Sequence, residues 1–111
     1  MPSKTILIQS EGLGKGDDKL GTILMANFLR LLGESKDKPA ALVFWNAGVR
    51  LLCEGSKVLE HLKRLDEQGV EILACTTCLE YLELTDKIKV GKPTTMAKSI
   101  QSMFSSDMIC L

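Results

Sequence analysis

Two cysteines separated by two threonines, Cys75-Thr-Thr-Cys78, are the residues of this chain best suited to covalent chemistry. A Cys-x-x-Cys pair can cycle between dithiol and disulfide, and a thiolate can attack a sulfur atom or accept one. Thr77 and Glu80 fit a capping box, which would place Cys78 first in a helix, where unpaired backbone N–H groups lower a thiol's pKa. We therefore take Cys75 and Cys78 as candidate catalytic residues. The residues between them, Thr76 and Thr77, are candidate binding residues.

Two other roles are open for the cysteines. A free cysteine is often buried and behaves as a small apolar residue, and we expect this of Cys53 and Cys110. All four cysteines could also reach one edge of a sheet and bind zinc. Structural zinc usually takes two closely spaced cysteine pairs, however, and this chain has one. We expect no metal and no cofactor.

A glycine-rich segment, Glu-Gly-Leu-Gly-Lys-Gly-Asp-Asp at 11–18, is the second candidate for a binding site. It lacks the Gly-Lys-Ser/Thr end of a P-loop and the final glycine of the dinucleotide fingerprint, and its aspartates would repel an anion. A tight turn followed by a helix cap explains it better. Glu11 and Asp17 would nevertheless lie at the cysteine edge and are binding candidates. Asn46 and Gly48, which end an expected strand, complete this set.

The composition argues against several classes of function. Fourteen basic and fourteen acidic side chains give no net charge and no dense basic cluster, which argues against nucleic acid. The longest apolar run, 40–45, is far shorter than the roughly 20 residues that span a bilayer. The lone histidine, His61, supports no Cys/His or Ser/His nucleophile, so hydrolysis is disfavoured. With no signal peptide, we expect a cytoplasmic protein whose thiols stay reduced.

The elements that must position these residues alternate along the chain. We expect strands at 5–9, 40–45, 70–74, 87–90 and 108–111. We expect a helix from Asp17 or Asp18 to Leu32, closed by Gly33, a second at 56–68, a short third that ends at Leu82, and a last one after a cap at Thr94 or Thr95. Without hairpin signals, this order predicts one α/β domain over 1–111, a three-layer α/β/α fold with a mostly parallel five-stranded sheet. Ligands of such folds gather beyond the carboxyl ends of the strands.

Two helices carry apolar stripes that we expect to face the core. The stripe of the last helix is Met96, Ile100, Met103 and Phe104, and that of the first is Leu20, Leu24, Phe28, Leu31 and Leu32. The first helix has further apolar residues at Ile23, Met25, Ala26 and Leu29. Apolar residues thus surround most of this helix, which predicts an interface and favours a homo-oligomer.

Four stretches together resemble the DsrE-like family, most closely the DsrE-like part of YedF-type proteins linked to selenium or sulfur metabolism. They are Ile-Leu-Ile-Gln-Ser-Glu-Gly-Leu-Gly-Lys-Gly-Asp at 6–17, Val-Phe-Trp-Asn-Ala-Gly-Val at 43–49, Leu-Cys-Glu-Gly-Ser at 52–56 and Gly-Val-Glu-Ile-Leu-Ala-Cys-Thr-Thr-Cys-Leu at 69–79. The resemblance implies a flavodoxin-like fold, small homo-oligomers and, in better understood relatives, a cysteine that carries persulfide sulfur between proteins. Cys75 and Cys78 stand in the corresponding loop.

The chain departs from this family in two ways. Relatives that relay sulfur often carry Arg-Gly after the cysteine loop, whereas here Glu80-Tyr-Leu-Glu-Leu84 follows, and this chain has no TusA-like sulfur-carrier segment.

Three hypotheses about the function stay open. The leading one is a sulfurtransferase-like carrier that relays persulfide sulfur to a partner protein. The others are a dithiol redox module and a non-catalytic assembly or regulatory subunit whose cysteines only pack.

Overall fold

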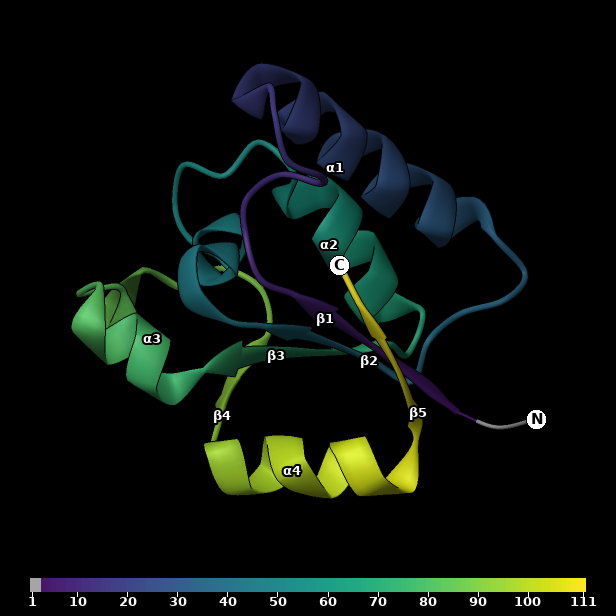
Figure 1. The fold of residues 1–111 in the computed structure, drawn as a ribbon, viewed down its shortest axis with the longest axis vertical. Helices are drawn as coiled ribbons and strands as arrows, with labels where there is room; N and C mark the ends of the chain where they lie inside the picture. The colour runs from purple at the N-terminus through teal and green to yellow at the C-terminus, as the bar shows by residue number, and fades with distance from the viewer. Residues whose placement is uncertain (1–2) are drawn as a thin grey trace.

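The computed structural model describes residues 3–111 and contains one five-stranded sheet (Figure 1). The strands run in parallel in the order β4-β3-β2-β1-β5. They are β1 (Lys4–Ile8), β2 (Ala41–Phe44), β3 (Glu71–Cys75), β4 (Lys92–Thr94) and β5 (Asp107–Cys110). The helices are α1 (Asp18–Glu34), α2 (Leu59–Glu67), α3 (Thr76–Tyr81) and α4 (Met96–Ser105), with 3-10 helices η1 (Asn46–Leu52) and η2 (Thr85–Lys87). The expected α/β class and parallel sheet are confirmed.

The segments that follow β1, β2 and β3 meet at one edge of the sheet. Helices α1 and α2 cover one face, and α4 crosses the other face on its way from β4 to β5 (Figure 1). The carboxyl ends of parallel strands meet at one edge. The loop after β1, the helix η1 after β2 and the helix α3 after β3 therefore lie there together.

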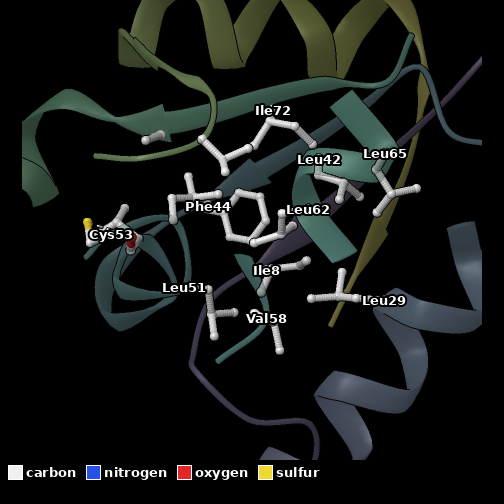
Figure 2. Packing of buried hydrophobic residues seen from close by; sticks show 14 of the residues in the cluster. Ile8, Leu29, Leu42, Phe44, Leu51, Cys53, Val58, Leu62, Leu65 and Ile72 are labelled. Carbon is white, nitrogen blue, oxygen red and sulfur yellow. Dashed lines mark hydrogen bonds between the residues drawn. The ribbon is translucent and has the colours of Figure 1, made fainter. Parts of the chain in front are cut away.

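The main core lies between the sheet and helices α1 and α2 (Figure 2). Strand side chains alternate between the two faces, so every second residue points into this core. The strands supply Ile8, Leu42, Phe44 and Ile72, and the helices supply Leu29, Leu62 and Leu65. Burial of each such side chain stabilises the fold by about 1.5–3 kcal/mol. Among residues 3–111, no helix has the length and apolar character that a bilayer crossing requires.

The expected core stripe of α1 was only partly right: Phe28 and Leu32 pack half-buried against the core, whereas Leu20, Leu24 and Leu31 are exposed. The fully buried residues of the helix are Gly21, Met25, Leu29 and Gly33. The glycines let the backbone approach its neighbours closely: the Leu13 N–H donates to the Gly21 carbonyl at 3.0 Å, and Gly33 packs against the Arg64 side chain. Gly33 therefore lies inside the helix, which continues to Glu34, with Ser35 as its C-cap.

In the last third of the chain, one strand and one helix face also differ from what the sequence predicts. The expected strand at 87–90 is absent, and Ile88 forms only an isolated antiparallel bridge with Cys53. The strand lies later, at Lys92–Thr94, and includes Pro93, which an edge strand tolerates because its outer N–H needs no partner. Helix α4 buries Ser99 and half-buries Met103, whereas Met96, Ile100 and Phe104 are exposed, so most of its expected core stripe faces away from the sheet.

Polar side chains cap helices α1 and α4 at their N-termini. Asp17 caps α1 by accepting the Leu20 N–H at 2.9 Å. Thr95 caps α4 in the same way, by accepting the Lys98 N–H at 3.2 Å. Both caps were among the expected ones. Helix α2 starts at Leu59, later than expected, because a turn precedes it in which the Val58 N–H donates to the Ser56 hydroxyl at 3.3 Å.

Gly48 fixes η1 against the sheet. A Cβ atom at this position would lie 2.5 Å from the carbonyl oxygen of Ile8. Because this oxygen belongs to the backbone of β1, the strand itself would have to shift to relieve the clash. We predict that Gly48→Ala lowers the free energy of unfolding by about 1–3 kcal/mol, measured by urea denaturation. Gly33→Ala is the control, since its Cβ would make only ordinary contact with Arg64, and helix propensity favours alanine by up to about 1 kcal/mol. Equal stability of the two variants would contradict this account of Gly48.

Candidate functional site

The two cysteines stand at the junction of β3 and α3. Cys75 is the last residue of β3 and the N-cap of α3, and its sulfur accepts the backbone N–H of Cys78 at 3.4 Å. The expected cap at Thr77 was therefore wrong, and Cys78 is the third residue of the helix rather than the first. The helix begins earlier because the chain turns directly at Thr76, whose hydroxyl donates to the Thr94 carbonyl of β4 at 2.9 Å.

Asn46 connects the cysteine pair to the neighbouring strand. It follows β2 closely, at the start of η1, and its backbone N–H donates to the Cys78 sulfur at 3.1 Å. Its φ of 51° lies in the left-handed region, which asparagine tolerates better than most residues. The segment behind it is held by Gly48, which touches the end of β1. The candidate residues Asn46 and Gly48 thus support the site through their backbone.

The environment raises the pKa of the Cys78 thiol above its ordinary value. Burial is the largest cause of the raised pKa, and the neighbouring Cys75 thiol adds to it. The Asn46 N–H acts in the opposite direction, because it stabilises a negative sulfur, but it does not offset burial. The expected lowering of the pKa at a helix N-terminus is therefore wrong for Cys78, which rests as a thiol at neutral pH.

The other two cysteines have different environments. Cys53 is buried within the core cluster (Figure 2), its thiol donates to the Val49 carbonyl at 3.2 Å, and burial raises its pKa. This confirms the packing role expected of Cys53. Cys110 is exposed on the edge strand β5, so the expectation that it is buried was wrong. Within residues 3–111, no three side chains of the usual metal-binding types gather into a cluster.

A cleft of about 540 Å³ opens between the loop after β1, the start of α1, η1 and the segment before α2. Its lining includes two acidic residues, Glu11 and Asp18, and two basic residues, Arg50 and Lys57. Neither cysteine of the pair reaches this cleft. Glu11 is thus separate from the sulfur site, and Asp17 is occupied as the cap of α1.

Sequence reasoning did not single out Arg50 and Lys57, nor the part played by the Asn46 N–H. The two cations follow β2 at the same edge as the expected binding residues, and that position was the available signal. The direction of the Asn46 N–H depends on a left-handed backbone, which the residue type permits but does not require.

We predict that Asn46→Val shifts the alkylation of Cys78 to higher pH. A β-branched residue does not hold φ of 51°, so the N–H that lowers the Cys78 pKa turns away from the sulfur. Asn46→Gly is the matched control, since glycine keeps both the conformation and the N–H. The measurement is the rate of iodoacetamide labelling of the Cys78 peptide, by mass spectrometry, across a pH series. A valine variant whose profile overlays that of the glycine variant would argue against this hydrogen bond.

Comparisons with known proteins agree on the fold. No protein-family model matches the chain, and no curated protein matches it. Among solved structures, YchN from E. coli superposes with a TM-score of 0.76 at 17% identity and covers 100% of both chains. Two proteins of unknown function also match. MTH1491 from Methanobacterium thermoautotrophicum superposes with a TM-score of 0.70 at 16% identity, over 98% of this chain and 99% of that one. BT1422 from Bacteroides thetaiotaomicron superposes with a TM-score of 0.66 at 15% identity, over 99% of this chain and 95% of that one. The chain therefore has the DsrE-like fold, which it shares with YchN.

Proposed function

We propose that this protein handles sulfane sulfur, with Cys78 as the residue that carries it. The observation that supports this most strongly is the backbone N–H of Asn46, 3.1 Å from the Cys78 sulfur. A fixed donor of this kind favours negative charge on a sulfur atom. Cys78 is also half-buried rather than enclosed, whereas Cys75 is only 6% exposed, so a donor molecule reaches Cys78 first.

The proposed reaction is an exchange of one sulfur atom between thiols. The deprotonated Cys78 sulfur attacks the outer sulfur of a persulfide donor, forms a new S–S bond and releases the donor as a thiolate. A partner thiolate then attacks the outer sulfur of the Cys78 persulfide and leaves Cys78 as a thiolate. No net oxidation occurs in either step. Because the Cys78 pKa is raised, loading will accelerate as the pH rises.

The DsrE-like fold and the resemblance to YedF-type proteins support the same proposal. In the better understood relatives, a cysteine of the corresponding loop carries persulfide sulfur, and here that loop holds Cys75 and Cys78. We further propose that the acceptor is a small sulfur-carrier protein. The link of YedF-type proteins to selenium makes selenium, which forms the analogous bonds, a second element to test.

We also propose that a second copy of the chain covers α1. Four large apolar side chains of this helix are exposed, namely Leu20, Ile23, Leu24 and Leu31. Together they form a larger apolar surface than scattered exposed residues would, and homo-oligomers are the commonest way to cover such a surface.

We predict that inorganic polysulfide adds one sulfur atom to Cys78 in a Cys110→Ser protein, which lacks the exposed thiol of β5. The sulfur should be located by mass spectrometry of the Cys78 peptide and should transfer to an added small thiol. Adding Cys78→Ser should abolish the gain, whereas Cys53→Ser, at a buried thiol, should leave it intact. A protein that gains no sulfur at Cys78 would favour the non-catalytic assembly instead.

A separate prediction concerns the exposed face of α1. The double change Ile23→Asp and Leu24→Asp should convert the oligomer to monomers, because two charges would be buried without partners. Lys89→Glu, at an exposed position between η2 and β4, changes the charge by the same amount away from α1 and should leave the assembly unchanged. Light scattering after size exclusion reports the mass. A wild-type protein that is monomeric at all concentrations would refute this assembly.

A further inference from the structure

The sulfurs of Cys75 and Cys78 are close enough to react with each other. The Cys75 sulfur lies 3.4 Å from the backbone nitrogen of Cys78 and accepts its N–H, so the two thiols are neighbours at the start of α3. Residues three apart at the start of a helix have Cβ atoms about 5–6 Å apart, and a disulfide needs about 3.5–4.5 Å. A local shift of about 1–2 Å would therefore join the pair.

We infer that Cys75 resolves the persulfide formed on Cys78, so that the site converts sulfane sulfur into sulfide. This inference rests on the proposed function, because it begins from a loaded Cys78. It assigns different tasks to the two thiols: Cys78 receives sulfur, and Cys75 expels it.

The step balances without an external oxidant. The Cys75 sulfur attacks the Cys78 sulfur that is bonded to Cβ, and a disulfide bond forms between the two residues. The bond from Cys78 to the outer sulfur breaks, and its electron pair leaves with the outer sulfur as hydrosulfide. This hydrosulfide takes the proton that the Cys75 thiol loses. The sulfane sulfur has gained two electrons and the cysteine pair has lost two, so a thiol reductant must restore the dithiol before another round.

The burial of the two residues favours attack on the inner sulfur of the persulfide. Cys75 is 6% exposed and lies at the end of β3, beneath the first turn of α3, whereas Cys78 is partly open to solvent. The outer sulfur extends from the more exposed residue, so the buried thiol faces the atom bonded to Cβ. The same burial keeps donors and partner thiols away from Cys75, which leaves Cys78 as its reaction partner.

The pair therefore sets up a competition for the loaded sulfur. A docked partner thiol takes the outer sulfur in a transfer without net oxidation, whereas Cys75 attacks the inner one when no partner is present. The protein is then a carrier in the presence of its acceptor and a source of sulfide in its absence.

The test follows sulfide and protein mass after a single loading. Reduced Cys110→Ser protein and its Cys75→Ser derivative are each treated with inorganic polysulfide and freed rapidly of excess reagent without added thiol. Released sulfide and intact mass are then followed over time. We expect the protein with Cys75 to release one sulfide per sulfur loaded and to finish two hydrogens lighter. The Cys75→Ser protein should keep its extra sulfur and release sulfide at least about tenfold more slowly, because it lacks the advantage of an adjacent nucleophile.

The outcomes separate this inference from the proposed function. If Cys75→Ser loads sulfur but both proteins then hold it equally long, the resolving role of Cys75 is refuted and the carrier stands. If neither protein gains sulfur, the carrier itself fails. Cys53→Ser, which removes a buried thiol of the core, serves as the matched control and should release sulfide at the rate of the parent. Release that is equally slow in that control would show a general loss of structure rather than a role for one residue.

Discussion

The hydrogen bond from the Asn46 backbone to the Cys78 sulfur is the contact on which the site depends. It joins the end of one strand to the helix that follows the next, so it exists only while β2 and β3 stay in register. Its direction is set by the left-handed conformation of Asn46, and its distance by the close packing of Gly48 on β1. The relative positions of three adjacent strands thus determine the direction of one N–H group. The donor is already in place before any charge develops on the sulfur.

Burial and this donor act on Cys78 in opposite directions. Burial raises the thiol's pKa more than the N–H lowers it, so the resting residue is neutral and slow to react with passing electrophiles. In the proposed function, the same N–H would stabilise the negative Cys78 sulfur that leaves when the partner thiol takes the outer sulfur.

The sequence predicts this fold well where a pattern has one physical solution. Short continuous apolar runs such as Ala41–Phe44 are typical of strands covered on both faces, and Asp17 and Thr95 have side chains that helix caps favour. The pattern fails for Leu20, Leu24 and Leu31 of α1, because the glycines that bring this helix close to its neighbours carry no hydrophobic signal. It fails again at Cys75, since a sulfur atom caps α3 where a hydroxyl was expected. The positions of both cysteines at the sheet edge follow from sequence; the contact with Asn46 arises only from the tertiary structure.

The place of β5 has a consequence for how the chain folds. It pairs with β1 through residues such as Lys4 and Asp107, which are 103 residues apart in sequence. Contacts between such distant segments are costly in chain entropy and slow to form. The first four strands can assemble by local steps, but β1 keeps an open edge until the α4 crossover delivers its second neighbour. During synthesis on the ribosome, that unpaired edge would be the surface most exposed to incorrect association.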